Sequence, residues 1–108
     1  MSCVFCKIVA GEIPATKVHE TPDIVVIRDL HPQAPVHVLV LPKKHVASLA
    51  ELDDPGLAAA ILKGVKDAAA KEGLKEFRAI ANTGEGAGQT VFHLHFHVMG
   101  GRSMKGLG

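Results

Sequence analysis

Several features that mark large protein classes are missing from this sequence. Positive charge is not in excess, since 12 lysines and arginines stand against 11 acidic residues, for a net charge of +1. Without a basic stripe, binding to a nucleic-acid backbone has little electrostatic support. No apolar run approaches the roughly 20 residues of a membrane-spanning helix, and no charged segment followed by an apolar one marks a secretory leader. We therefore expect a cytoplasmic protein that binds neither nucleic acid nor membrane.

Cysteine is also scarce. The chain has two cysteines, Cys3 and Cys6, which are too few for the disulfide framework of a small secreted domain. Their C-x-x-C spacing is that of half a tetrahedral zinc site, and His45 and His93 are available nitrogen donors that would complete it. The alternative is a pair of reduced thiols, one of them packed in the core. The sequence leaves both interpretations open.

The remaining residues predict one globular domain over residues 1–108, because 47% of them are hydrophobic and 21% are charged. Asp54-Pro55 is a strong helix start, and apolar residues at helical spacing continue to Gly73. Gly64 inside this helix favours a close helix–helix contact, which we take as one sign of a dimer. The other predicted elements are two short helical turns, 5–10 and 45–52, and three strands, 24–28, 36–41 and 77–82. Together they predict an α+β fold with an antiparallel sheet and helices on one of its faces.

Three histidines alternate with apolar residues in segment 91–99. Period-2 alternation predicts a strand, with Phe92, Leu94, Phe96 and Val98 in the core. The other face would then carry His93, His95 and His97, about 6–7 Å apart. Neutral imidazoles can attack, exchange a proton or bind metal, so this row predicts either a catalytic surface or, with a further ligand, a catalytic metal site. The alternative is a half-buried strand whose polar face happens to carry histidines.

The neighbouring segments offer groups suited to a nucleotide. Glycines in the loop 83–90 let backbone N–H groups converge on an anion, although the loop could equally be a flexible hairpin connection. Asp29, at the end of a predicted strand, would accept the two hydroxyls of a ribose or cap its own turn. His37 would orient the histidine row by hydrogen bonding, unless it is a structural histidine. His19 and His31 are expected at the surface.

The segment from His93 to Met99 resembles the His-φ-His-φ-His-φ-φ signature of the histidine triad superfamily, where φ is apolar. The resemblance extends over nearly the whole chain and is closest to the nucleotide-binding (Hint) branch. Diadenosine-polyphosphate hydrolases are less similar relatives. The other segments that carry the resemblance are Phe5-Cys6-Lys7-Ile8, Gly11-Glu12-Ile13-Pro14, Pro32-Gln33-Ala34-Pro35-Val36-His37, Pro42-Lys43-Lys44-His45, Asn82, Gly88-Gln89-Thr90 and Gly100-Gly101-Arg102.

The resemblance implies a homodimer with a five-stranded antiparallel sheet and one main helix in each subunit. It also implies a phosphoramidase that hydrolyses purine nucleoside 5′-phosphoramidates, derivatives of AMP or GMP, to the nucleoside monophosphate and an amine. The alternatives are a nucleotide-binding regulatory module with incidental slow hydrolysis, or a diadenosine-polyphosphate hydrolase. Thr90 stands where relatives commonly carry serine, and the tail 103–108 lacks an aromatic residue that some relatives have, which leaves the substrate preference open.

By position, the resemblance gives each site residue a role. His95 would be the nucleophile, His97 would contact the phosphoryl oxygens, and His93 and His37 would complete the histidine set. Nucleotide binding would fall to Ile27 and Leu30 at the base, Asp29 at the ribose, and Asn82, Gly88, Gln89 and Thr90 at the phosphate. No acidic cluster suited to Mg²⁺ adjoins the triad, so catalysis is expected to need no cofactor. A zinc ion on Cys3, Cys6, His45 and His93 would be structural, and its removal would leave the chemistry of His95 intact.

Overall fold

The structure is a computed structural model that describes residues 3–106. It contains helices α1 (Val4–Val9) and α2 (Pro55–Lys71), and 3₁₀ turns η1 (Leu49–Glu51) and η2 (Glu85–Ala87). The strands are β1 (Lys17–Glu20), β2 (Ile24–Arg28), β3 (Val36–Pro42), β4 (Phe77–Ile80) and β5 (Phe96–Gly100). They form one five-stranded sheet in the order β1-β2-β3-β5-β4, with every neighbouring pair antiparallel. The α+β fold with a five-stranded antiparallel sheet and one main helix is therefore confirmed.

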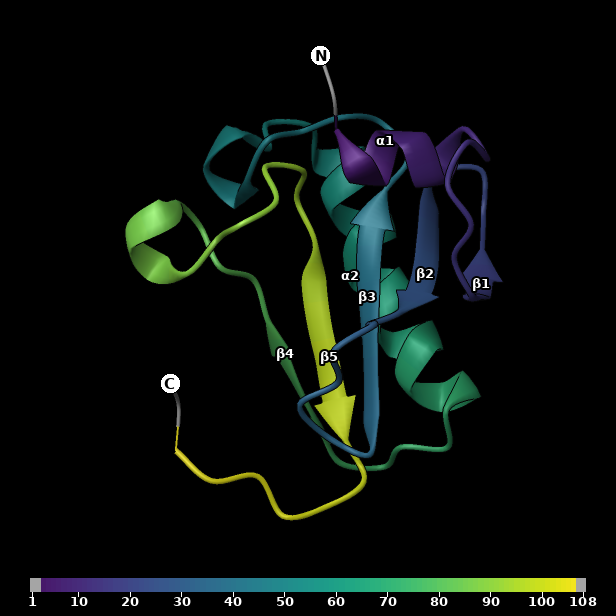
Figure 1. The fold of residues 1–108 in the computed structure, drawn as a ribbon, viewed down its shortest axis with the longest axis vertical. Coiled ribbons are helices and arrows are strands. Elements are labelled where there is room, and N and C mark those ends of the chain that lie inside the picture. Colours follow the sequence, from purple (N-terminus) through teal and green to yellow (C-terminus); the bar gives the residue numbers. More distant parts are fainter. Residues whose placement is uncertain (1–2, 107–108) are drawn as a thin grey trace.

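The two helices lie on opposite faces of the sheet (Figure 1). On the α2 face, Val26 and Val40 join the helix in one buried cluster. On the other face, Phe5 and Ile8 of α1 pack against alternate residues of β2 and β3, namely Val25, Ile27, Leu39 and Leu41. The expectation that helices cover one face is wrong, because the apolar runs of β2 and β3 are buried on both faces and each face needs a cover.

Helix α2 begins as its sequence predicts. The Asp54 side chain caps it by accepting a hydrogen bond from the Leu57 N–H at 3.1 Å. Gly64 faces the sheet, where a Cβ atom would lie 3.0 Å from both Ile24 Cδ1 and Val40 Cγ1. The close approach at Gly64 is thus between helix and sheet within one chain, not between two helices. The homodimer stays a prediction, without support from this glycine.

Strand β5 begins at Phe96, five residues after the start of the predicted segment 91–99. Residues 93–95 have no regular secondary structure. The prediction that the three histidines form a single row along a strand is therefore wrong. Leu94 and Val98 are buried as expected, but Phe92 is 50% exposed and does not enter the core. Strand β4 ends at Ile80, and β1 was not predicted, because its four residues Lys-Val-His-Glu carry little apolar signal.

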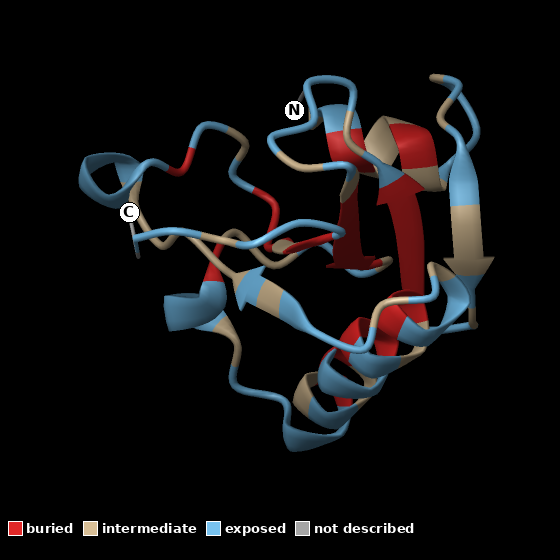
Figure 2. Cartoon of the chain, turned by 90° about the horizontal axis from the view of Figure 1, so that it is seen from below, coloured by how far each residue is buried: buried red, intermediate tan, exposed pale blue. Residues whose placement is uncertain are grey.

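Burial is unequal across the sheet. Figure 2 shows the buried residues concentrated in β2, β3 and the inner side of α2, whereas β4 and the tail are exposed or half-buried. Residues 107 and 108 of the tail lie outside the described residues. Between residues 3 and 106, no helix combines the length and the apolar character needed to cross a bilayer.

Candidate active site

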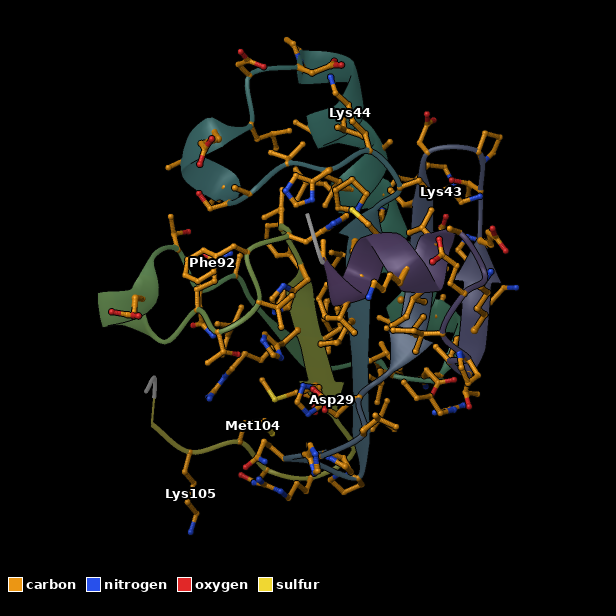
Figure 3. The ribbon with its side chains drawn as sticks, turned by 45° about the horizontal axis from the view of Figure 1, so that its top comes forward. Asp29, Lys43, Lys44, Phe92, Met104 and Lys105 are labelled. Atoms are coloured by element: carbon orange, nitrogen blue, oxygen red, sulfur yellow. The ribbon has the colours of Figure 1, made fainter. Side chains whose placement is uncertain are left out.

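A hollow of about 380 Å³ lies between α1, β2, β3 and the segment that leads into β5. Apolar side chains line most of it, among them Phe5, Ile8, Ile13, Ile27 and Leu39. The polar residues that line it are Thr16, Arg28, Asp29, His31, Thr90, His95 and His97. Asp29 lies close to the C-terminal end of β5, whereas Phe92 lies on the loop that leads into the other end of this strand (Figure 3). An apolar hollow with a few convergent polar groups is typical of a small-molecule site.

The hydrogen bond of His95 fixes which of its nitrogens is free. Its Nδ1 lies 2.7 Å from the backbone oxygen of His93. A carbonyl oxygen only accepts, so Nδ1 carries the proton and Nε2 carries the lone pair. His95 is 8% exposed and lines the hollow, so its imidazole is held beside the space for a ligand.

A chain of hydrogen bonds through His37 determines which nitrogen of His97 carries the proton. The Gln33 N–H donates to His37 Nδ1 at 2.9 Å, so the other nitrogen of neutral His37, Nε2, carries a proton. That proton faces His97 Nδ1 at 2.9 Å. His97 Nδ1 is therefore an acceptor, which leaves its Nε2–H as a donor. His37 thus contacts one histidine of the predicted row, His97, by a hydrogen bond.

Burial keeps this pair of histidines neutral. Loss of solvent lowers the pKa of His97 to about 4, with smaller contributions from His95 and His37 and an opposing one from Asp29. Burial likewise lowers the pKa of His37, and the Asp29 carboxylate opposes it. Both imidazoles are uncharged at pH 7, so their contact is a hydrogen bond between a donor and an acceptor rather than a repulsion between two cations.

Asp29 is tied to the same chain. Its Oδ1 accepts the His31 N–H at 2.8 Å, and its Oδ2 lies 3.3 Å from His37 Nε2. The carboxylate thus caps its own turn and also lines the hollow. Its geometry therefore fits both predicted roles, the cap of a turn and a contact to ribose hydroxyls. Leu30 beside it is 88% exposed at the mouth of the hollow.

The predicted phosphate-binding residues separate into two groups. Thr90 lines the hollow beside His95 and His97. Asn82 lines an adjoining hollow of about 380 Å³ that shares Asp29, His31 and His97 with the first. Gly88 lies against Asn82, since a Cβ atom there would be 3.8 Å from the Asn82 Cγ.

Gln89 has a structural role in this conformation. Its Oε1 accepts the Gly84 N–H at 2.9 Å, and its Nε2 donates to the carbonyl oxygens of Ala47 and Val91 at 2.7 and 3.1 Å. The side chain is buried, and these bonds engage both of its amide hydrogens. Gln89 therefore shapes the glycine loop from within instead of reaching into the hollow.

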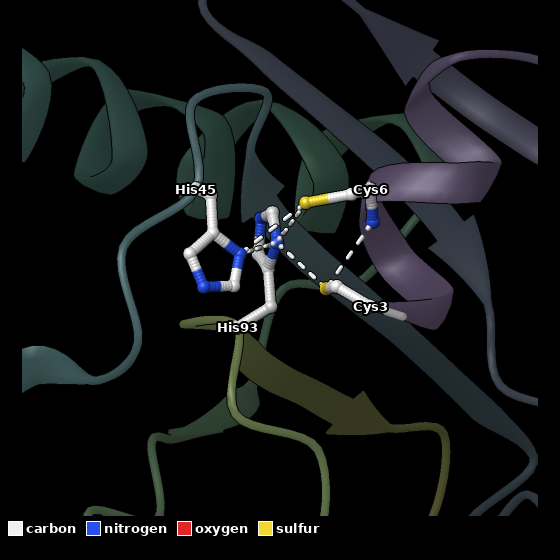
Figure 4. A group of neighbouring side chains, drawn as sticks. All are labelled: Cys3, Cys6, His45 and His93. Carbon is white, nitrogen blue, oxygen red and sulfur yellow. Dashed lines mark hydrogen bonds between the residues drawn. The ribbon is translucent and has the colours of Figure 1, made fainter. Parts of the chain in front are cut away.

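Cys3, Cys6, His45 and His93 converge beside α1 (Figure 4). The nitrogen atoms that converge are both Nδ1, 3.2 Å apart. Cys3 Sγ lies 3.4 Å from His93 Nδ1, and Cys6 Sγ lies 3.2 Å from His45 Nδ1 and 3.5 Å from His93 Nδ1. We call these four residues the Cys/His cluster.

The Cys/His cluster fits a tetrahedral zinc ion. Typical zinc–nitrogen and zinc–sulfur bond lengths place the nitrogens of such a site about 3.3 Å apart and each nitrogen about 3.6 Å from a sulfur, close to the separations found here. The Nε2–H of His93 donates to the Pro42 oxygen at 2.7 Å, which leaves Nδ1 as a lone pair that faces the cluster. Burial, followed by the Cys3 thiol, raises the pKa of Cys6, an effect that a bound cation would oppose.

The three triad histidines do not form a common metal site. His93 belongs to the Cys/His cluster, His97 belongs to a group with Asp29 and His37, and His95 belongs to neither. Their coordinating nitrogens also point to different partners. The interpretation of the row as a catalytic metal centre is therefore wrong, because the residues do not lie along one strand face.

Some residues of the site were not found from the sequence. Phe5 of α1 lines the hollow, and its ring lies edge-on to His95 with centroids 5.0 Å apart. The backbone groups of Gln33 and Pro42 fix two histidine tautomers. Backbone partners carry no side-chain signal. The position of Phe5 between the two cysteines was the available clue to its place near the histidines.

Comparison with known proteins identifies the family. The sequence profile described as the HIT domain, the histidine triad domain, matches residues 10–104. The chain belongs to the HIT family. It is 47% identical to protein HitA of Neisseria gonorrhoeae over 92% of this chain and 95% of that protein. The crystal structure of a HIT family hydrolase from Legionella pneumophila superposes with a TM-score of 0.92 at 47% identity, covering 96% of each chain.

Two further HIT structures bear on the site. A histidine triad nucleotide-binding protein from Candida albicans is 37% identical with a TM-score of 0.83, over 90% of this chain and 73% of that one. A zinc-bound histidine triad family protein from Mycobacterium smegmatis is 36% identical with a TM-score of 0.83, over 94% of this chain and 76% of that one. This HIT chain therefore shares its fold with proteins described as a hydrolase, as nucleotide-binding and as zinc-bound.

Proposed function

We propose that the protein hydrolyses purine nucleoside 5′-phosphoramidates to the nucleoside monophosphate and an amine. The observation that carries this proposal is the free Nε2 lone pair of His95 at the polar side of an apolar hollow. The apolar walls suit a base, and the Asp29 carboxylate suits the ribose hydroxyls. The HIT relatives described as a hydrolase and as nucleotide-binding support the same assignment.

In the proposed reaction, His95 Nε2 attacks the phosphorus atom. A bond from phosphorus to Nε2 forms, the bond from phosphorus to the amine nitrogen breaks, and the leaving amine takes up a proton from water. The Nε2–H of His97 donates to a phosphoryl oxygen as charge develops there. A water molecule then attacks the nucleotidyl-histidine, which releases the monophosphate and restores the neutral imidazole.

The same proposal includes a structural zinc ion on Cys3, Cys6, His45 and His93. The four ligand atoms and the His93–Pro42 hydrogen bond support it, as does the zinc-bound relative. Zinc would supply no step of the reaction. The Hint branch, a homodimer and a cytoplasmic location complete the proposal.

The experiment that tests this function is steady-state turnover against a matched panel: adenosine 5′-phosphoramidate, guanosine 5′-phosphoramidate, a cytidine analogue and diadenosine tetraphosphate. We expect the two purine phosphoramidates to have the highest kcat/KM. Preference for diadenosine tetraphosphate would favour the dinucleotide hydrolase alternative. Tight AMP binding without turnover of any substrate would favour a regulatory binding module.

A further inference from the structure

The proposed nucleophile is not held by the sheet. Residues 93–95 lack regular structure, and the pairing of β5 with β3 begins at Phe96 and Val40. Its position instead depends on a few individual contacts. Because ladder hydrogen bonds do not fix this segment, the groups that form those contacts control where His95 points.

Two of these contacts lead directly to the Cys/His cluster. His93 faces the cluster through Nδ1 and accepts the Nδ1–H of His95 at 2.7 Å through its backbone oxygen. The next residue, Leu94, donates its N–H to the oxygen of Val46 at 2.7 Å, directly after His45. Two members of the cluster thus adjoin the hydrogen bonds that hold the 93–95 segment.

A third contact passes through α1. Phe5 lies between Cys3 and Cys6 in the chain, lines the hollow, and places its ring edge-on to His93 and His95 at centroid distances of 5.9 and 5.0 Å. The short helix is fastened to the cluster at both cysteines. A change in the cluster therefore reaches the wall of the hollow and the nucleophile together.

We propose that the metal ion held by the Cys/His cluster positions His95, so that occupancy of this centre sets turnover as well as stability. This inference rests on the proposed function and departs from the expectation that metal removal leaves the chemistry of His95 intact. Without a cation, the four side chains lose their common ligand and are held together only by hydrogen bonds of 3.2–3.5 Å between thiols and imidazoles, so the cluster can open. A displacement of about 1 Å at the reacting atom commonly costs about a hundredfold in rate.

The first test compares zinc-loaded and chelator-treated wild-type protein labelled with ¹⁵N-histidine. We expect removal of zinc to lower kcat for adenosine 5′-phosphoramidate about a hundredfold while KM changes less than about threefold. The slowly exchanging Nδ1–H proton of His95 should be lost from the NMR spectrum, and added zinc should restore both readouts. A folded metal-free protein with an unchanged His95 Nδ1–H signal and kcat would overturn the inference.

Paired substitutions at His45 cover the case in which metal-free wild type unfolds. His45→Ala removes a ligand at an exposed position, whereas His45→Cys replaces it with another zinc ligand. We expect His45→Cys to recover most of the kcat that His45→Ala loses. His19→Asn, on β1, is the control for loss of a histidine outside the cluster. Equal kcat in the two His45 variants at full zinc loading of His45→Cys would contradict the inference.

The NMR readout separates this inference from the proposed function. Zinc-loaded protein that hydrolyses no phosphoramidate would refute the function, and the response of the His95 Nδ1–H proton to zinc would still decide whether the Cys/His cluster positions it.

Discussion

Two groups of side chains bring potential metal-ligand atoms within 4.8 Å of one another. One is Cys3, Cys6, His45 and His93 beside α1, and the other is Asp29 after β2, His37 on β3 and His97 on β5. In the Cys/His cluster, the Pro42 oxygen takes the Nε2 proton of His93 and leaves its Nδ1 lone pair facing the other ligands. In the second group, the Gln33 N–H occupies His37 Nδ1, so a proton lies between His37 and His97.

The difference shows that proximity of ligand residues does not define a metal site. A backbone acceptor beyond the ring turns a histidine lone pair toward its neighbours, whereas a backbone donor turns a proton toward them. We therefore expect the first group to bind zinc and the second to act as a neutral hydrogen-bond relay. His95 lies between the two groups, since it donates to His93 and its ring lies 5.0 Å from that of His97.

The largest effect is expected at His95 itself. His95→Asn should lower kcat by about 10⁴-fold or more, because the covalent intermediate can no longer form. AMP affinity should stay within about threefold in calorimetric titration, because Asp29 and the apolar walls still bind the nucleotide. His97→Ala is the comparison: it should slow turnover by about a hundredfold, since it removes one donor and leaves the nucleophile. Near-wild-type turnover of His95→Asn would assign the nucleophile elsewhere.

The second-largest effect is expected from zinc, which should bind the Cys/His cluster and not the group of Asp29, His37 and His97. Protein purified without chelator should contain one zinc per chain by atomic emission, and chelation should lower Tm by about 15 °C, since a ligand at about a thousand times its Kd contributes about 4 kcal/mol. His37→Asn should leave the zinc content unchanged, whereas Cys6→Ser should reduce it. Loss of zinc from His37→Asn would contradict this prediction, because it would place the ion on Asp29, His37 and His97.

The buried relay should make stability depend on pH. The pKa of His97 falls from its usual value near 6.5 to about 4, so between these values the unfolded chain binds a proton that the folded chain does not. Stability is therefore full above about pH 6.5 and lost as the pH falls toward 4, by about 3 kcal/mol. The lowered pKa values of His37 and His93 act in the same direction.

Urea unfolding at several pH values would measure this effect. His97→Gln should have a shallower loss of stability between pH 6.5 and 4 than wild type, and His31→Gln, at an exposed position, should not. Identical slopes in wild type and His97→Gln would mean that His97 is not buried as a neutral group.

The smallest effect is expected at His37, which acts through His97. His37→Asn should lower kcat about tenfold, because His97 Nδ1 loses its donor and the ring is no longer fixed. KM for adenosine 5′-phosphoramidate should change little. A large rise in KM with unchanged kcat would instead make His37 a binding residue.

Local sequence signals predicted much of the fold. Asp54-Pro55 and the helical spacing after it located α2, and the β-branched run 24–28 located β2. The histidine alternation misled for a tertiary reason: His93 bonds to Pro42 and Leu94 bonds to Val46, which divert the chain before β5 starts. The place of α1 opposite α2 could not be predicted, since it depends on which face of the sheet remains uncovered.

The sequence predicted which residues form the site, but not which histidine nitrogens carry a proton. The C-x-x-C spacing and the available histidines identified the four members of the Cys/His cluster, and the structure brings them together. The tautomers of His37, His93 and His95 depend on backbone groups of Gln33, Pro42 and His93, which no side-chain pattern reveals. Similarly, the internal bonds of Gln89 depend on Gly84 and Ala47, which meet it only in the folded chain.

Rapid-quench mass spectrometry during turnover of adenosine 5′-phosphoramidate tests the central claim, that His95 Nε2 is the nucleophile, most directly. We expect an added adenosine monophosphate on the peptide that contains His95 within the first turnover, absent from His95→Asn and retained in His37→Asn. The phosphoryl group should be attached at Nε2 and not at Nδ1, since Nδ1 donates to the His93 oxygen. An adduct on another residue, or attachment through Nδ1, would contradict it.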